Sequence, residues 1–381
     1  MTYYMIAGEA SGDLHASKLI SSLRSEDPQA RFRLWGGDLM LEAAGDAGTL
    51  ISHYREGAVM GFVEVVRKGL TLLKRLSRCK EDLLANRPDL LILTDYPGFN
   101  MKMARFAHEH GIKVIYYISP KVWAWKEGRL KAMKRYIDRL YIIFPFEVPY
   151  FKSKNLKAVY HGCPLLDIVL DSPAANEPRE AFLSRHSLPD KKYIALLAGS
   201  RELEIDFLLP RMRAMCECLK GPEEFGFLLA CAPGIDKKKY LKMLEGSPII
   251  PIWGDTHGVL KQSVAAVVSS GTASLETAIM GTPQIVCYGG SRISIWIARH
   301  VLKITTISLA NMILGRRIFN EWIQDECEPG RLAGEVLSLA TDKDRREKMA
   351  ADYREMLSLM GERGSASRVA KDIIEFLNQT I

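Results

Sequence analysis

The sequence contains few cysteines, and they are not spaced as a disulfide framework or a zinc site. Seven cysteines occur among 381 residues, their number is odd, and no C-x-x-C pair is present. Disulfide-rich domains and zinc sites need closely and regularly spaced cysteines, so the sequence disfavours both. Scattered cysteines are typical of a reducing compartment, and we expect a cytoplasmic protein without a bound metal.

Long apolar runs are also absent. The longest, such as residues 264–268, have the length of a β-strand, whereas roughly 18 apolar residues are needed to span a bilayer. The first strand-like residues lead into the polar, glycine-rich residues 8–13 and do not resemble a secretion signal. We therefore expect a soluble protein that at most binds to a membrane surface.

Two common nucleotide-binding motifs are missing as well. Neither the P-loop spacing G-x-x-x-x-G-K-[ST] nor a helix-opening G-x-G-x-x-G occurs, which disfavours a P-loop NTPase and a dehydrogenase. The net charge of +7 suits an anionic partner such as a nucleotide or an acidic lipid surface. Because the basic residues do not form a run interleaved with aromatics, a nucleic-acid-binding function is disfavoured.

What the sequence does contain is an alternation of short apolar runs with longer amphipathic ones. This pattern predicts parallel strands joined by crossover helices. The predicted strands cover residues 3–7, 32–35, 90–94, 113–118, 140–144, 158–161, 191–197, 225–231, 249–253, 265–269 and 284–287. The fold class is therefore α/β, with two Rossmann-like doubly wound halves, and we expect them to face a ligand-binding cleft.

A segment with two prolines and no large apolar residue, residues 171–178, separates the two series of strands. The length of 381 residues suits two domains of ordinary size. We predict an N-terminal domain over residues 1–170, a C-terminal domain over 171–340 and a charged helical tail over 341–381.

In the second half, two loops carry glycine and hydroxyl side chains directly after an apolar strand. Residues 198–201 follow one strand and residues 269–276 another, and a helix is predicted to begin after each loop. Free N–H groups at a helix start favour an anion, and the guanidinium of Arg201 can bind a diphosphate with two hydrogen bonds. Together the loops indicate a nucleoside diphosphate site, with Glu276 placed for ribose hydroxyls. Either loop alone could equally be an ordinary capped helix start.

Acidic residues stand at the corresponding places of the first half. The loop after the first strand carries Glu9, Asp13 and His15, and Asp95 comes just after another strand. Side chains of these types transfer protons in general acid–base catalysis. They could instead cap helices and compensate helix dipoles, and the sequence alone leaves both interpretations open.

Residues 58–76 form a basic and apolar segment, AVMGFVEVVRKGLTLLKRL. One interpretation is an amphipathic helix that packs on the core. The other is a membrane-surface element whose apolar side chains contact acyl chains and whose basic side chains contact lipid phosphates. In this second interpretation, the residues that contact acyl chains are Val59, Met60, Phe62, Val63, Val66, Leu70 and Leu73.

Taken together, nine stretches resemble the lipid-A-disaccharide synthase family, the glycosyltransferases of lipopolysaccharide assembly in Gram-negative bacteria. In chain order they are AGEASGDLHA, AVMGFVEV, DYPGFN, YYISPKVWAWKEGR, FPFE, GSRELEI, SSGTASLETA, ISLANMILGRR and, more loosely, WIQDECEP. They extend from residue 7 to residue 329 in consistent order. One stretch alone is weakly diagnostic, whereas the set is specific.

The resemblance implies a B-type glycosyltransferase fold and a defined reaction. UDP-2,3-diacylglucosamine would transfer its sugar to 2,3-diacylglucosamine 1-phosphate, giving a β-1,6-linked disaccharide 1-phosphate and UDP with inversion at the anomeric carbon. It also implies that no metal or other cofactor is needed, that the protein associates peripherally with the inner membrane, and that a homodimer forms through the C-terminal segment.

The resemblance further implies roles for individual residues. The UDP site would comprise Gly199, Ser200, Arg201, Ser270, Gly271, Thr272, Glu276, Asn311 and Arg316. The acceptor side would comprise Asp95, Glu9, Asp13 and His15, with Asp95 as the general base. Many family members have a second acid where this sequence has Gly98, so Asp13 and His15 stay open as alternative bases. The family's Gly-His-Pro is here residues 162–164, with Cys163 in place of the histidine.

Two other classes of function share some of these features. Another UDP-sugar glycosyltransferase or a UDP-sugar epimerase would have the same diphosphate loops, but an epimerase does not need an apolar entrance near residues 58–76. A non-catalytic protein that binds sugar nucleotides or lipids at a membrane surface is the other alternative. Such a protein does not need an acid at a strand end, and Asp95 therefore argues against it.

Overall fold

The computed structural model describes residues 1–57, 64–124, 126–219, 225–289 and 306–379, without the side chains of residues 64–71. The chain divides into two compact units, one formed by Met1–Pro164 with Glu362–Ile381 and the other by Leu165–Gly361. None of the described helices combines the length and the apolar character that a membrane span requires.

The first unit contains a seven-stranded parallel sheet in the order β3-β2-β1-β4-β5-β6-β7. Its strands are β1 (Thr2–Ala7), β2 (Arg31–Gly36), β3 (Gly48–His53), β4 (Leu90–Thr94), β5 (Lys113–Tyr117), β6 (Arg139–Ile142) and β7 (Val159–Tyr160). The order reverses between β1 and β4, which pair directly. In doubly wound sheets, ligands bind outside the carboxyl ends of the strands at this switch point.

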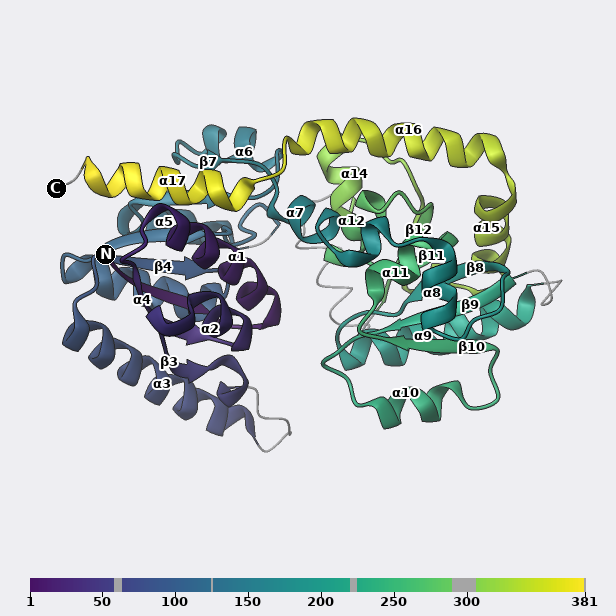
Figure 1. Ribbon diagram of the computed structural model, residues 1–381, viewed down its shortest axis with the longest axis horizontal. Coiled ribbons are helices and arrows are strands. Elements are labelled where there is room, and N and C mark those ends of the chain that lie inside the picture. The colour runs from purple at the N-terminus through teal and green to yellow at the C-terminus, as the bar shows by residue number, and fades with distance from the viewer. Residues whose placement is uncertain (58–63, 125, 220–224, 290–305, 380–381) are drawn as a thin grey trace. The chain divides into compact units, whose positions relative to one another are not determined.

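Helices cover both faces of this sheet (Figure 1). Side chains alternate along β1: Tyr3 and Met5 join the core under α1 (Ala10–Glu26), α2 (Asp38–Ala44) and α17 (Ser365–Asn378). Tyr4 and Ile6 point to the other face, under α3 (Glu64–Asn86), α4 (Pro97–Glu109) and α5 (Leu130–Tyr136). Burial on both faces explains why the central strands are continuous apolar runs in the sequence.

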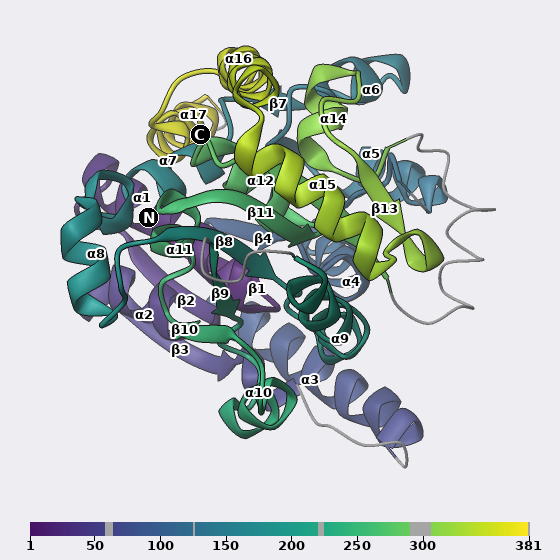
Figure 2. The ribbon, with the colours of Figure 1, turned by 90° about the vertical axis from the view of Figure 1, so that its right-hand side faces the viewer.

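The second unit repeats this plan with six parallel strands in the order β10-β9-β8-β11-β12-β13 (Figure 2). They are β8 (Lys192–Leu197), β9 (Phe225–Cys231), β10 (Ile249–Trp253), β11 (Ser263–Ser269), β12 (Gln284–Tyr288) and β13 (Glu321–Ile323). Its described helices are α7 (Pro164–Leu170), α8 (Arg179–Arg185), α9 (Glu202–Cys218), α10 (Lys237–Leu244), α11 (Thr256–Lys261), α12 (Thr272–Ile279), α14 (Leu309–Leu314), α15 (Pro329–Thr341) and α16 (Lys343–Met360). The switch point here lies between β8 and β11.

The predicted fold class is confirmed, because both units are doubly wound α/β sheets in Rossmann order. Every predicted strand occurs, with ends within a few residues of those expected. The sequence pattern missed β3 and β13. β3 includes only one fully buried residue, Ser52, and β13 is three residues long, so neither forms an apolar run.

The predicted domain limits differ from the two units. The first unit ends at Pro164 rather than at residue 170, and the segment expected as one tail is divided, with α16 in the second unit and α17 in the first. α17 packs beside α1 and buries Val369, Ile373 and Leu377 at helical spacing. Its Asp372 accepts hydrogen bonds from Arg139 Nε (2.8 Å) and the Tyr141 hydroxyl (2.7 Å). The charged composition of this segment does not predict these contacts with the first unit.

Candidate active site

Both diphosphate-type loops of the second unit lie at its switch point. Leu197 of β8 pairs with Val268 of β11, so residues 198–201 and residues 270–271 leave neighbouring strands at the same sheet edge. α9 begins directly after the first loop and α12 directly after the second. Two helix starts are therefore brought together, each with free N–H groups that favour an anion.

The loop after β8 has a backbone that only glycine adopts easily. Gly199 has a φ of +117°, and a Cβ built there would lie 2.6 Å from the Cβ of Glu204. The Glu204 carboxylate accepts hydrogen bonds from the backbone N–H groups of Ser200 (3.0 Å) and Arg201 (3.4 Å). This role of Glu204 could not be predicted from the sequence, although Glu204 lies within the GSRELEI motif.

The Arg201 guanidinium is exposed, with 77% of its side chain accessible, and lies 3.6 Å from Glu204. Exposed ion pairs of this kind contribute little to stability. An incoming diphosphate can therefore compete for the guanidinium at small cost, and its fork of N–H groups suits phosphate oxygens.

The loop after β11 is braced from two sides. The Ser270 N–H donates to the Cys287 carbonyl (2.8 Å), and its hydroxyl donates to the Ile307 carbonyl (3.1 Å). Gly271 follows with a φ of +152°, and Thr272 opens α12 and is exposed. The hydroxyl of Ser270 is thus already used inside the protein, whereas the backbone beyond it faces open space.

Glu276 lies one turn into α12 and forms a pair that the sequence did not predict. Its Oε2 lies 3.3 Å from Nε2 of His257, and about a fifth of each side chain is exposed. His257 stands on α11, which follows β10. The pair fixes the carboxylate at the sheet edge while leaving acceptor capacity for sugar hydroxyls.

The last two predicted UDP-site residues contact other parts of the second unit. Asn311 is buried, and its Nδ2 donates to Glu321 (2.8 Å). Glu321 also accepts from the N–H groups of Ile307 and Ser308, so Asn311 supports the segment that holds Ser270. Arg316 pairs with Asp352 (2.8 Å) and Glu355, both on α16. Here these side chains support the fold around the loops.

In the first unit, Asp95 stands at the switch point in an unusual backbone. Asp95 and Tyr96 have φ values of +44° and +45°, which cost free energy for residues other than glycine. The Asp95 carbonyl accepts hydrogen bonds from Asn100 Nδ2 (2.8 Å) and from the Tyr116 hydroxyl. These bonds stabilise the turn, which places the half-buried Asp95 carboxylate just past β4.

The loop after β1 meets the same turn. A Cβ on Gly8 would lie 2.2 Å from the Tyr96 ring, so glycine is required at this position. Burial, together with the carboxylate of Glu9, raises the pKa of Asp95 above its usual value, and the cation of Lys121 acts in the opposite direction. Glu9 and Lys121 are exposed. The structure therefore brings Asp95 and Glu9 together, as the sequence suggested.

Asp13 and His15 have different surroundings. The Asp13 carboxylate is buried and accepts from the backbone N–H groups of Gly37 (2.8 Å), Leu39 (3.2 Å) and Met40 (3.2 Å). It therefore caps the start of α2, which was the alternative interpretation of this acid. His15 lies half-buried within α1.

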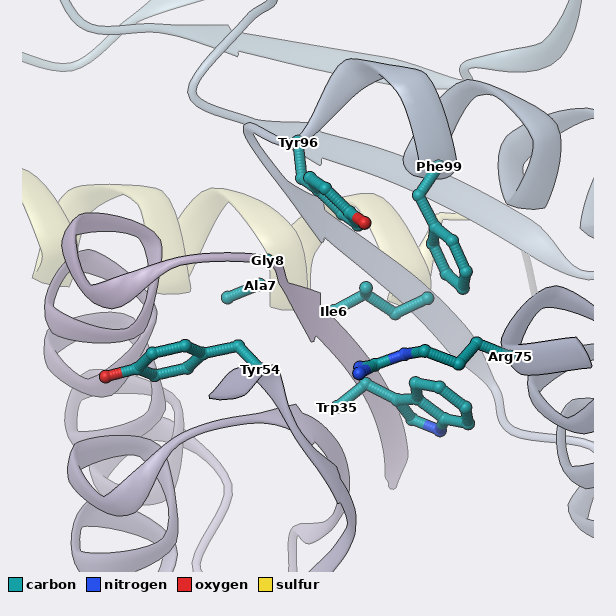
Figure 3. A pocket seen from close by; sticks show the side chains of 8 residues that line it. All are labelled: Ile6, Ala7, Gly8, Trp35, Tyr54, Arg75, Tyr96 and Phe99. Atoms are coloured by element: carbon teal, nitrogen blue, oxygen red, sulfur yellow. The ribbon is translucent and has the colours of Figure 1, made fainter. Parts of the chain in front are cut away.

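A pocket of about 150 Å³ opens next to this turn (Figure 3). Its lining consists of one arginine, four aromatic residues and the end of β1: Arg75, Trp35, Tyr54, Tyr96, Phe99, Ile6, Ala7 and Gly8. The Arg75 side chain extends over the Trp35 ring, and Tyr96 and Phe99 stand opposite. No local motif indicates this pocket, because its aromatic residues come from three separate segments.

A buried glutamate contacts two residues of the neighbouring SPKVWAW motif, Ser119 and Trp123. Glu147 accepts from the Ser119 hydroxyl (3.0 Å), Trp123 Nε1 (3.1 Å) and the N–H groups of Ile143 and Phe144. Burial raises the pKa of the Glu147 carboxyl, and these hydrogen bonds oppose the shift. The FPFE motif is thus joined to Ser119 and Trp123 by hydrogen bonds, and the Trp123 side chain is half-buried.

Most of the predicted membrane contacts cannot be placed. Val59, Met60, Phe62 and Val63 lie outside the described residues, and Val66 and Leu70 lie in α3 with side chains that are not described. Leu73 is described, and 56% of its surface is exposed on α3. Among the described residues, no three His, Cys, Asp or Glu side chains are grouped as a metal site.

Solved structures share this two-unit architecture. A UDP-N-acetylglucosamine 2-epimerase from Neisseria meningitidis bound to UDP-GlcNAc superposes with a TM-score of 0.63 at 12% identity, covering 100% of both chains. The glycotransferase of kitacinnamycin also gives 0.63, at 15% identity, covering 99% of this chain and 98% of the other. The chain thus has the B-type fold that glycosyltransferases and UDP-sugar epimerases share.

The sequence relationship is more specific. The profile of the lipid-A-disaccharide synthetase family matches residues 3–374. The lipid-A-disaccharide synthase of Myxococcus xanthus is 37% identical over 377 residues, 98% of this chain and 97% of that protein. That of Syntrophus aciditrophicus is 36% identical over 370 residues, 96% and 95% of the two chains. The chain belongs to the lipid-A-disaccharide synthase family, which consists of hexosyltransferases.

Proposed function

We propose that the protein transfers 2,3-diacylglucosamine from its UDP derivative to the 6-hydroxyl of 2,3-diacylglucosamine 1-phosphate, with inversion. The observation that carries this proposal is the placement of complementary groups at the two switch points. Two glycine-containing loops, each followed by a helix start, stand at one, between β8 and β11, and an acid with a raised pKa stands at the other, beyond β4. Membership of the family gives the reaction class to which these groups fit.

The donor would be held by the second unit. Backbone N–H groups of residues 199 and 271–272 and the guanidinium of Arg201 would contact the diphosphate, and Glu276 would accept from the ribose. As the anomeric carbon–oxygen bond breaks, negative charge develops on the leaving UDP. Fixed N–H dipoles and a guanidinium stabilise that charge more than the charge of the bound donor, and this difference accelerates the reaction.

The acceptor would be activated by the first unit. The Asp95 carboxylate would take the proton of the 6-hydroxyl while the hydroxyl oxygen attacks the anomeric carbon from the face opposite UDP. One carbon–oxygen bond forms, one breaks, the proton passes to Asp95 and the electron pair leaves with UDP. A single displacement of this kind inverts the configuration.

The proposal is tested by incubating the full chain with both lipid substrates and measuring UDP and disaccharide. We expect one UDP per disaccharide, and no UDP release without the acceptor. UDP released at the same rate without acceptor would indicate a hydrolase. A changed sugar configuration in a UDP-sugar, with no disaccharide formed, would indicate an epimerase, and either result would overturn the proposal.

The pH profile should reveal the environment of Asp95. A general base must be deprotonated, so kcat/KM should fall as the pH drops through the raised pKa of Asp95. Glu9→Gln removes a charge that raises this pKa and should move the acidic limb to lower pH. Lys121→Met removes a charge that lowers it and should move the limb to higher pH. Shifts in the same direction, or none, would exclude Asp95 as the titrating group.

We also propose that the protein binds the inner-membrane surface through residues 58–76. The exposed Leu73 and the adjacent exposed Lys74 support this proposal. We expect the full chain to co-sediment with vesicles that contain anionic phospholipids, and to do so less with neutral vesicles. Equal amounts of protein left in the supernatant with both kinds of vesicle would contradict this proposal. The homodimer stays a prediction, which analytical ultracentrifugation tests.

A further inference from the structure

The pocket beside Asp95 contains a cation whose hydrogen-bonding capacity is mostly unused. The Arg75 guanidinium lies 5.6 Å from the centroid of the Trp35 ring. Its Nη2 donates only a long hydrogen bond, 3.5 Å, to the His53 carbonyl. Nη1 is buried and has no hydrogen-bond partner within the part of the chain that the structure describes. A buried donor without an acceptor is costly, so a ligand that supplies oxygens is favoured.

No carboxylate takes the place of that ligand among the described residues. An acid that interacts electrostatically with Arg75 is Glu56, whose pKa is lowered chiefly by the Ser52 hydroxyl and also by Arg75. The Glu56 oxygens accept from Ser52 (2.7 Å) and from the His53 N–H (3.2 Å). Glu56 therefore acts on Arg75 electrostatically but accepts no hydrogen bond from it. N–H groups of the guanidinium remain available for another anion.

The position and size of the pocket indicate which anion. Gly8 and Tyr96 line it, and they are the direct neighbours in sequence of Glu9 and Asp95. A group bound in this pocket therefore lies against the turn that carries the acid that we assign to the acceptor hydroxyl. A volume of about 150 Å³ accommodates a benzene-sized group, which suits a phosphate with part of a sugar ring and is too small for a complete acyl chain.

We propose that Arg75 binds the 1-phosphate of the acceptor and thereby selects a phosphorylated acceptor over a neutral one. The inference rests on the proposed function, in which the acceptor phosphate is the only charged group of that substrate. The carboxylates of Asp95, Glu9 and Glu56 would repel a phosphate in this region. Arg75 offsets that repulsion, and its planar fork can hold two phosphate oxygens.

Arg78 offers a matched control one turn further along α3. It also lies over the Trp35 ring, 6.0 Å from the centroid. Its Nη2 already donates to the Ile51 carbonyl at 2.9 Å, and its side chain is exposed and outside the pocket lining. Substitution of Arg78 therefore removes the same charge from the same helix and ring without touching the proposed phosphate site.

The experiment measures binding of 2,3-diacylglucosamine 1-phosphate and of 2,3-diacylglucosamine lacking the phosphate, each in neutral detergent micelles. Arg75→Gln should raise the Kd for the phosphorylated lipid by roughly 10- to 100-fold, the range for losing hydrogen bonds to a charged group. The Kd for the neutral lipid should stay unchanged. Arg78→Gln should alter neither constant, and Arg75→Lys should lie between Arg75→Gln and the unmodified protein.

Two results would overturn the inference. Equal weakening of both lipids by Arg75→Gln would mean that Arg75 only maintains the shape of the pocket. An equal effect of Arg78→Gln on the phosphorylated lipid would mean that general surface charge, not this pocket, attracts it. Because the readout is binding, the inference stands or falls independently of turnover. A phosphate preference that depends on Arg75 without disaccharide formation would reject the proposed function alone.

Discussion

Replacing Asp95 by Asn should lower kcat by about 10²- to 10⁴-fold, the range for losing a positioned general base. Asparagine keeps the size of the side chain and leaves intact the backbone turn, which Asn100 and Tyr116 hold through the Asp95 carbonyl. Only the capacity to take a proton disappears. Steady-state kinetics with saturating donor and acceptor would measure the loss.

Two controls accompany this variant. UDP binding, followed by calorimetry, should be unchanged in Asp95→Asn, because the donor loops belong to the second unit. Asp13→Asn should mainly reduce thermal stability, since its carboxylate caps α2 through three backbone N–H groups. Near-normal kcat in Asp95→Asn, combined with loss of kcat in a stably folded Asp13→Asn, would transfer the role of base to Asp13.

Replacing Arg201 by Gln should reduce kcat/KM for the donor by about 10²- to 10³-fold, the size of effect seen when one stabiliser of developing charge is removed. The guanidinium is exposed and weakly paired, so the fold should tolerate its removal. The loss should appear in kcat as well as in KM, because charge on the leaving diphosphate increases in the transition state. Product inhibition by UDP should weaken in parallel.

Arg213→Gln, on the helix that follows the loop, is the matched control. Arg213 lies three turns further along α9, donates to the Met243 carbonyl and pairs with Glu217. It should leave the donor kinetics unchanged, and Arg201→Lys should restore part of the loss by keeping the charge. If Arg201→Gln behaved like Arg213→Gln, the loop after β8 would not contact the diphosphate.

The sequence predicted those features that depend on short-range patterns. Apolar runs buried on both sides predicted the central strands, and the glycine-containing loops directly after them marked candidate binding loops at the carboxyl ends of those strands. Because both sheets follow the Rossmann order, loops after β1, β4, β8 and β11 meet in pairs. Asp95 could therefore be placed with Glu9, and the loop of Arg201 with that of Glu276, without a structure.

Other features depend on contacts between distant segments, which local patterns do not encode. Asp13 and Asn311 match family motifs, but only their hydrogen-bond partners reveal what they do. Asp13 accepts from backbone N–H groups. Asn311 donates to Glu321, which supports the segment that holds Ser270. The lining of the Arg75 pocket comes from five separate segments. The docking of α17 on the first unit likewise depends on Arg139 and Tyr141, far from it in sequence.

The most direct test of the account is the structure of the product formed by the purified chain, determined by NMR from isotope-labelled donor and acceptor. The account predicts a sugar of the donor joined to carbon 6 of the acceptor, with a large coupling between the first two ring protons that marks the β configuration. An α-linked disaccharide, or free diacylglucosamine with no new glycosidic bond, would contradict a single displacement assisted by Asp95.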